Sequence, residues 1–67
     1  MKKEFKVISE LIEERSRVLD VGCGDGDLMK YLNENKTVDI RGLEISKKSV
    51  QNCLSKGLTV IEGNAEN

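Results

Sequence analysis

Three glycines at alternate positions, Gly22, Gly24 and Gly26, follow the acidic residue Asp20 and precede an apolar pattern of helical spacing. Glycine adopts positive φ angles readily and lets a ligand approach the main chain closely. The following helix would direct its free N–H groups and the positive end of its dipole toward the turn, which suits an anionic group. A strand, a glycine turn and a helix in this order are typical of the opening of a nucleotide-binding α/β domain.

A second candidate is Glu44, which lies 18 positions after Gly26 at the carboxyl end of a predicted strand. In a doubly wound α/β domain, an acidic side chain at this place accepts hydrogen bonds from the hydroxyls of a ribose. The alternative is a strand-end glutamate that points to solvent or caps the next helix. Its position relative to the glycine turn favours the ribose.

The elements that would position these residues alternate between helix and strand. We expect a packing helix over residues 1–15, with an apolar stripe made of Phe5, Ile8, Leu11 and Ile12. Residues 16–67 then read as β-α-β-α-β, with strands at 18–21, 38–45 and 58–61. The first of these strands is apolar enough to be buried on both faces, as in the middle of a parallel sheet.

The last helix of this series has the clearest boundaries. Ser46 is a good N-cap, and Gly57 would end the helix. Its apolar face is predicted to consist of Val50, Cys53 and Leu54.

Composition restricts the classes of function. A chain of 67 residues makes one small domain whose core alone leaves it marginally stable. Eleven basic and twelve acidic residues give a net charge of −1, which offers no electrostatic case for binding nucleic acid or a membrane. There are two cysteines, no histidine, and no signal peptide or long apolar run. We therefore expect a cytoplasmic protein without a metal and with reduced thiols.

The spacing acidic-x-G-x-G-x-G from Asp20 to Gly26 resembles motif I of class I S-adenosylmethionine-dependent methyltransferases. A dinucleotide fingerprint, G-x-G-x-x-G, would need a third glycine at position 27, where Asp27 stands. This departure disfavours a nicotinamide-dependent oxidoreductase. The resemblance implies S-adenosylmethionine or S-adenosylhomocysteine as the cofactor, and Asp20 near its ammonium group or bracing the turn.

In the methyltransferase pattern, an acidic residue after the third strand accepts a hydrogen bond from the adenine amino group. By position this would be Asn64, with the N–H of Ala65 next to a ring nitrogen. The amide oxygen of asparagine can still accept, without the assistance of a charge. Asn64 as a simple turn residue is the competing interpretation. The contacts that the resemblance implies come from Asp20, Gly22, Cys23, Gly24, Gly26, Glu44, Ile45, Asn64 and Ala65.

Three stretches, V-L-D-V-G-C-G-D-G-D-L, G-L-E-I and V-x-x-C-L-x-x-G-L-x-V-I-E-G-N, resemble the methionine-biosynthesis MetW family over about residues 14–67. The resemblance implies a role in methionine synthesis beside a homoserine acyltransferase, and a methyl acceptor that is unknown or absent. It covers about the first third of such a protein. We therefore expect a truncated, three-layer Rossmann-like α/β fold with parallel strands in the order 3-2-1, forming the N-terminal cofactor-binding half of the domain.

In the complete fold, the groups that bind the acceptor come from strand 4 onward. We therefore assign no catalytic residue and expect no methyl transfer by this polypeptide alone. Cys23 is interpreted as a small buried residue and not as a nucleophile. A non-catalytic regulatory or partner-binding protein is the alternative function.

Without a fourth strand, strand 1 would present an open edge with unpaired main-chain groups. We expect the chain to self-associate there, through paired first strands or by exchanging elements.

Overall fold

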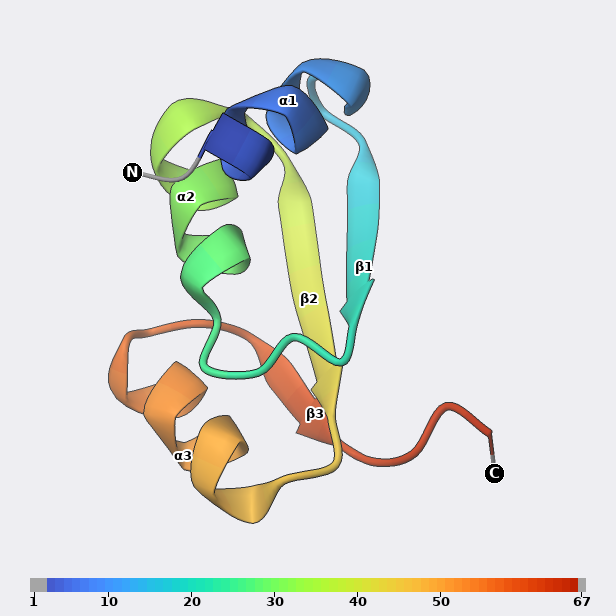
Figure 1. Ribbon diagram of the computed structural model, residues 1–67, viewed down its shortest axis with the longest axis vertical. Helices are drawn as coiled ribbons and strands as arrows, with labels where there is room; N and C mark the ends of the chain where they lie inside the picture. The colour runs from blue at the N-terminus through green and yellow to red at the C-terminus, as the bar shows by residue number, and fades with distance from the viewer. Residues whose placement is uncertain (1–2, 67) are drawn as a thin grey trace.

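The computed structural model describes residues 3–66, which fold into helices and strands in strict alternation (Figure 1). The elements are α1 (Lys3–Leu11), β1 (Arg17–Val21), α2 (Asp27–Asn35), β2 (Asp39–Glu44), α3 (Lys47–Ser55) and β3 (Val60–Glu62). The strands form one parallel sheet in the order β1-β2-β3. The predicted α/β class and strand order are confirmed.

The helices cover one face of this sheet. α2 and α3 pack against the strands, and α1 packs against α2 (Figure 1). On the opposite face, Leu19, Val21 and Ile61 are each more than half exposed. Residues 3–66 thus form two of the three layers of a doubly wound fold and leave one face of the sheet bare.

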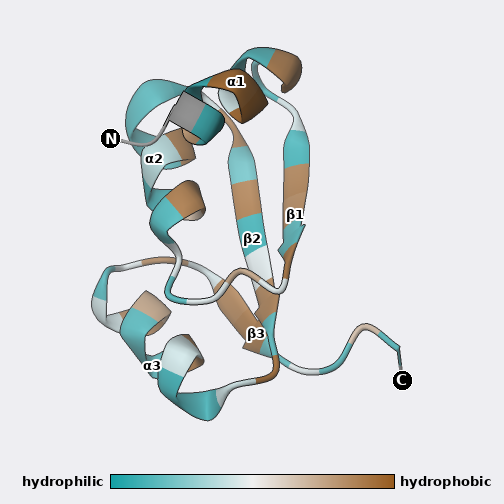
Figure 2. Cartoon of the chain, viewed as in Figure 1, coloured by the Kyte–Doolittle hydropathy of each residue, from teal (hydrophilic) through white to brown (hydrophobic). Residues whose placement is uncertain are grey.

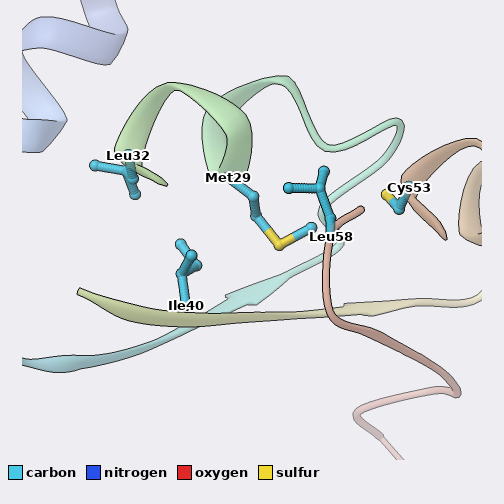
Figure 3. Packing of buried hydrophobic residues seen from close by; sticks show 5 residues of the cluster. All are labelled: Met29, Leu32, Ile40, Cys53 and Leu58. Atoms are coloured by element: carbon cyan, nitrogen blue, oxygen red, sulfur yellow. The ribbon is translucent and has the colours of Figure 1, made fainter. Parts of the chain in front are cut away.

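The core lies between the helices and the covered face of the sheet (Figure 3). Met29 and Leu32 recur at helical spacing on α2, and both are fully buried. Ile40 of β2, Cys53 of α3 and Leu58 before β3 complete the cluster. Burial of this apolar surface is the main term that stabilises so small a domain.

The expectation that the first strand is buried on both faces is wrong for this structure. β1 is apolar along much of its length (Figure 2), yet Leu19 and Val21 are both 58% exposed. The reason is that, within residues 3–66, helices cover only one face of the sheet, and Leu19 and Val21 point to the other face. Val18 packs against the core, so β1 alternates between covered and bare side chains.

α1 also differs from its prediction. It ends at Leu11 instead of residue 15, and the first two residues of the predicted helix lie outside the described range. Leu11 is 80% exposed, whereas Ser9 is buried and Ile12 packs against the core. Phe5 reaches Tyr31 of α2, with ring centroids 5.8 Å apart. Phe5 and Ile12 of the predicted stripe therefore pack, whereas Leu11 does not, and Ser9 lies on the packed side in its place.

The cap predicted for α3 is confirmed. The hydroxyl oxygen of Ser46 accepts a hydrogen bond from the N–H of Ser49 at 3.2 Å. Val50 and Cys53 are buried, but Leu54 is 56% exposed. Leu54 follows Cys53 by one position, so it is turned by about 100° around the helix, away from the sheet.

Candidate functional site

The glycine turn connects β1 to α2. Gly22, Gly24 and Gly26 all have positive φ angles, of 72°, 59° and 87°. The N–H of Gly22 donates to the carbonyl of Leu43 on β2 at 2.7 Å, which ties the start of the turn to the sheet. Gly26 ends the turn and caps α2 in the left-handed conformation. This conformation is costly for residues with a Cβ, and it explains the alternate glycines.

The three glycines differ in what lies beside them. A Cβ added to Gly22 or Gly24 would meet nothing within 4 Å, so both α-carbons face open space. A Cβ added to Gly26 would collide with Leu58 and lie 3.0 Å from the sulfur of Cys53. Gly22 and Gly24 can therefore face a ligand, whereas Gly26 serves packing.

Glu44 is the last residue of β2, and its carboxylate joins two segments. Oε1 accepts from the N–H of Gly24 at 2.8 Å, and Oε2 accepts from the N–H of Ser46 at 2.9 Å. The N–H groups of Ser46 and Gly24 hold the pKa of this carboxyl below its ordinary value, against the opposing effect of burial. Glu44 is therefore an anion that fixes the glycine turn and the start of α3.

A groove of about 210 Å³ opens beside this carboxylate, at the carboxyl ends of the strands. Five of its lining residues were predicted to bind the cofactor, namely Gly22, Glu44, Ile45, Asn64 and Ala65. Four others were not predicted: Val21, Leu43, Gly63 and Glu66. Val21 and Leu43 are register partners in adjacent strands, so the strand ends alone could have indicated them.

The remaining predicted site residues do not line the groove. Asp20 pairs in register with Gly42, on the face covered by the helices, and burial raises the pKa of its carboxyl. Cys23 packs its sulfur against Gly42. The groove lining contains neither of these two side chains, nor Gly24 and Gly26. They support the turn, and their contact with a cofactor stays a prediction.

Asn64 adopts the turn conformation that was its competing interpretation. Its Oδ1 accepts from the N–H of Glu66 at 2.9 Å, which is an Asx turn. The side chain is exposed at the end of the groove, next to Ala65. The turn does not exclude a ligand contact, because an amide oxygen can accept two hydrogen bonds.

The role of α3 in holding the glycine turn was not predicted from the sequence. Nδ2 of Asn52 donates to Oδ1 of Asp25 at 3.1 Å, and Nζ of Lys56 donates to the Asp25 carbonyl at 2.7 Å. The Asn52 hydrogen bond is the main reason why the pKa of Asp25 is lowered. Cys53 donates its S–H to the carbonyl of Gly24 at 3.1 Å. These contacts join residues about 27 to 31 positions apart, so no local pattern reveals them.

A second and larger hollow, of about 440 Å³, lies beside the first residues of β1 and β2. It is lined by Arg17, Val18, Leu19, Asp39 and Arg41. It shares no lining residue with the groove beside Glu44, and it holds an exposed Arg41–Asp39 ion pair at 3.6 Å. Within residues 3–66, no cluster of three or more histidine, cysteine or acidic side chains could hold a metal ion. Nor does any helix of that range have the length and apolarity needed to cross a bilayer.

The sequence matches the family model described as "Methionine biosynthesis protein MetW" over residues 2–67. No match was found among curated proteins. Among solved structures, the chain resembles a TehB-like SAM-dependent methyltransferase from Corynebacterium glutamicum, with 21% identity and a TM-score of 0.79. It also resembles DesVI from Streptomyces venezuelae, with 27% identity and a TM-score of 0.76.

A SAM-dependent methyltransferase from Geobacter sulfurreducens, solved in complex with S-adenosyl-L-homocysteine, matches with 19% identity and a TM-score of 0.68. These three alignments cover 91%, 91% and 97% of the present chain, but only 34%, 28% and 30% of the other proteins. The chain thus has the methyltransferase fold and spans about a third of the length of these proteins.

Proposed function

Because the chain belongs to the MetW family of methionine biosynthesis proteins, we propose that it binds S-adenosylmethionine or S-adenosylhomocysteine in the groove beside Glu44. The observation that carries this proposal is the link between Glu44 and Gly24. It joins an ionised carboxylate at the end of β2 to a glycine turn with open space beside it. A ribose needs an acceptor for its hydroxyls, and the rest of the cofactor needs a main chain that it can approach closely.

The residues present fit the nucleoside part of the cofactor. Each oxygen of Glu44 accepts one main-chain N–H and keeps the capacity for another donor, such as a ribose hydroxyl. Gly22 lines the groove without a side chain, and Ile45 offers an apolar surface, 65% exposed, on which an adenine can lie. Asn64 and Ala65 lie at the end of the groove, where they could contact the edge of the base. When bound, the cofactor supplies a methyl group carried on its sulfonium.

The groove is small for this role. Pockets that enclose a drug-sized ligand usually measure about 300–1,000 Å³, and this groove measures about 210 Å³. We therefore propose that residues 3–66 contact one side of the nucleoside and bind it weakly, with a dissociation constant in the micromolar to millimolar range. This range corresponds to about 4–8 kcal/mol of binding free energy.

Calorimetry with S-adenosylhomocysteine, and with NAD as the control ligand, tests the proposal. We expect saturable binding of S-adenosylhomocysteine and no binding of NAD. Glu44→Ala should weaken it roughly ten- to hundredfold, because the ribose loses a charge-assisted acceptor. Glu62→Ala is the matched control: Glu62 is the register partner of Glu44 on β3 and is exposed, so affinity should change less than about twofold. Absence of binding to a chain shown to be folded by circular dichroism would overturn the assignment.

A second candidate function, protein association, is favoured by the free edge of β1. The carbonyl of Ser16 accepts from the N–H of Asp39, and the N–H of Gly22 donates to Leu43. In a parallel ladder, alternate residues bond to a given neighbour. The main-chain groups of Arg17, Leu19 and Val21 consequently point away from β2.

We propose a second copy of the chain as the occupant of this edge. In an antiparallel pair centred on Leu19, the outward groups of Leu19 lie opposite Leu19 of the second copy, and those of Arg17 lie opposite Val21. Each residue whose main-chain groups point away from β2 then lies opposite another such residue. The edge can therefore pair with the same edge of a second copy.

Analytical ultracentrifugation at increasing concentration tests this pairing. Leu19→Lys should abolish self-association, because two ammonium groups would meet at the two-fold axis. Ile61→Lys is the control: it changes a residue that is 56% exposed, against 58% for Leu19, but that lies on β3, at the opposite edge of the sheet. A wild-type monomer at high micromolar concentration would contradict self-association. Binding of a homoserine acyltransferase that Leu19→Lys abolishes would assign the edge to that enzyme instead.

A further inference from the structure

The two cysteines of the chain meet beneath the glycine turn, although 29 residues separate Cys53 from the Gly24 carbonyl that it binds. The sulfur of Cys53 lies 3.1 Å from that oxygen, and the sulfur of Cys23 lies 3.8 Å from the same atom. The two thiols thus share one carbonyl oxygen as their acceptor. Both cysteines are free thiols in this structure.

The surroundings hold the two sulfur atoms in place. A Cβ on Gly42 would lie only 2.6 Å from the sulfur of Cys23, so this glycine creates the space that the thiol fills. Cys53 is fully buried among Met29 and Leu58 of the core (Figure 3). Cys23 is partly exposed, so it is the member of the pair that lies nearer to solvent.

We propose that Cys23 and Cys53 are a redox modification site, at which a low-molecular-weight disulfide such as oxidised glutathione forms an intramolecular disulfide between the glycine turn and α3. The proposal goes beyond cofactor binding and does not depend on it. Two thiols that bind the same carbonyl oxygen lie side by side, one on a partly exposed residue and one buried, as such an exchange requires.

The exchange has two steps. The thiolate of Cys23 attacks one sulfur of the glutathione disulfide, which gives a mixed disulfide and releases one glutathione thiolate. The thiolate of Cys53 then attacks the sulfur of Cys23 and releases the second glutathione. In sum, two protein thiols and one glutathione disulfide give one protein disulfide and two glutathione thiols. The protein is oxidised and glutathione is reduced.

The environment makes this reaction slow near neutral pH. Burial, the neighbouring Cys53 and the carboxylates of Asp20 and Glu44 raise the pKa of the Cys23 thiol to about 11. Because only the thiolate attacks, the rate should rise about tenfold for each pH unit between 7 and 10. The raised pKa of Cys23 means that its thiolate is not stabilised in the reduced form, so the disulfide, once formed, should resist reduction.

Oxidation would change the glycine turn. A disulfide has a sulfur–sulfur distance of about 2.05 Å, which is much shorter than any contact between two sulfur atoms that are not bonded to each other. Closing this distance pulls Cys23 toward α3. It also removes the S–H that Cys53 donates to Gly24, the residue whose N–H binds Glu44. We therefore expect oxidation to alter the groove beside Glu44.

Mass spectrometry of the wild-type chain after incubation with oxidised glutathione tests the proposal. The expected product is a monomer about 2 Da lighter, without maleimide-reactive thiols, whose proteolytic fragments containing Cys23 and Cys53 are joined. As a matched control, the double substitution Cys53→Ala and Leu54→Cys keeps two thiols but moves one to the solvent side of α3. This variant should form mixed disulfides with glutathione and no internal bridge.

The proposal is overturned if the folded wild-type chain keeps both thiols, or stops at the mixed disulfide, after prolonged incubation at pH 9. A rate independent of pH would contradict the thiolate mechanism. Binding of S-adenosylhomocysteine to the oxidised chain, compared with the reduced chain, measures the consequence for the groove. A loss of roughly tenfold is expected. If the reduced chain does not bind the ligand at all, cofactor binding fails while the bridge detected by mass stands.

Discussion

The main-chain N–H of Gly24 donates a hydrogen bond to Oε1 of Glu44 at 2.8 Å, across 20 residues of sequence. The other oxygen of the same carboxylate binds the N–H of Ser46, where α3 begins. One side chain therefore fixes the geometry of the turn, the end of β2 and the start of the next helix. Any ligand that binds Glu44 acts on all three segments.

Stability should depend on the ionisation of Glu44. Hydrogen bonds from Ser46 and Gly24 lower the pKa of this carboxyl in the folded state. The unfolded carboxyl has its ordinary value, about 4.5. The contribution of Glu44 is therefore complete above pH 5, and it is lost as the pH falls through the folded pKa.

Urea unfolding at pH 7 and at pH 3 would measure this effect. Glu44→Gln should lower stability at pH 7 and make the difference between the two pH values smaller than in the wild type. Glu34→Gln removes the same charge from an exposed position on α2, so the difference in stability between pH 7 and pH 3 should stay as in the wild type. An equal difference for Glu44→Gln and the wild type would refute the role of this carboxylate.

Removal of the α3 cap should weaken the fold. The hydroxyl of Ser46 satisfies the N–H of Ser49, which has no partner within the helix. Ser46→Ala should cost about 1 kcal/mol in the free energy of unfolding. Ser46→Asn, which retains an oxygen acceptor, should lose only a few tenths of this amount. Chemical denaturation followed by circular dichroism distinguishes the two variants, and equal stabilities would argue against the cap.

Gly42 should not tolerate a methyl group. Its Cβ would lie 2.6 Å from the sulfur of Cys23 and 2.8 Å from Cε of Met29, both on the buried side of β2. Gly42→Ala should therefore destabilise the chain by about 1–3 kcal/mol. In Gly63→Ala, the nearest atom is the tip of Leu43 at 3.3 Å, so the cost should be smaller. A stable Gly42→Ala variant would show that the sulfur atoms can move aside.

The core depends on Met29, which is fully buried. It belongs to the same cluster as Cys53 of α3, against which Cys23 of the glycine turn also packs. Met29→Ala should cost about 2–5 kcal/mol. A domain of this size has only about 3–10 kcal/mol in total, so the variant should be partly unfolded at 25 °C by circular dichroism. Leu54→Ala, at a side chain that is 56% exposed, should change stability by less than about 0.5 kcal/mol.

The local elements could be predicted because their signals lie close together in the chain. The alternate glycines demand positive φ angles, and Ser46 supplies an acceptor three residues before the N–H that it caps. The place of Glu44 at the end of a strand was predicted correctly, and Glu44 lines the groove, while its contact with a ribose stays a prediction. The parallel direction of the strands could be predicted because a helix connects each strand to the next, and such a crossover returns the chain to the same end of the sheet.

The burial of individual side chains could not be predicted in the same way. Leu11, Leu54 and Leu19 are apolar, yet they are 80%, 56% and 58% exposed. A hydrophobic pattern states which side chains could be buried. It does not state at which residue a helix ends, or which face of a sheet the helices cover.

By itself, the sequence determined the class of fold, the order of its elements, and the chemistry available at the glycine turn and at Glu44. The tertiary structure decided that Gly26 serves packing while Gly22 faces open space, and that α3 holds the turn through Asn52, Cys53 and Lys56. The physical reason is the separation along the chain of the residues that each interaction joins. Backbone dihedral angles and helix caps depend on neighbours within a few residues, whereas contacts such as that of Cys53 with Gly24 exist only after distant segments have packed together.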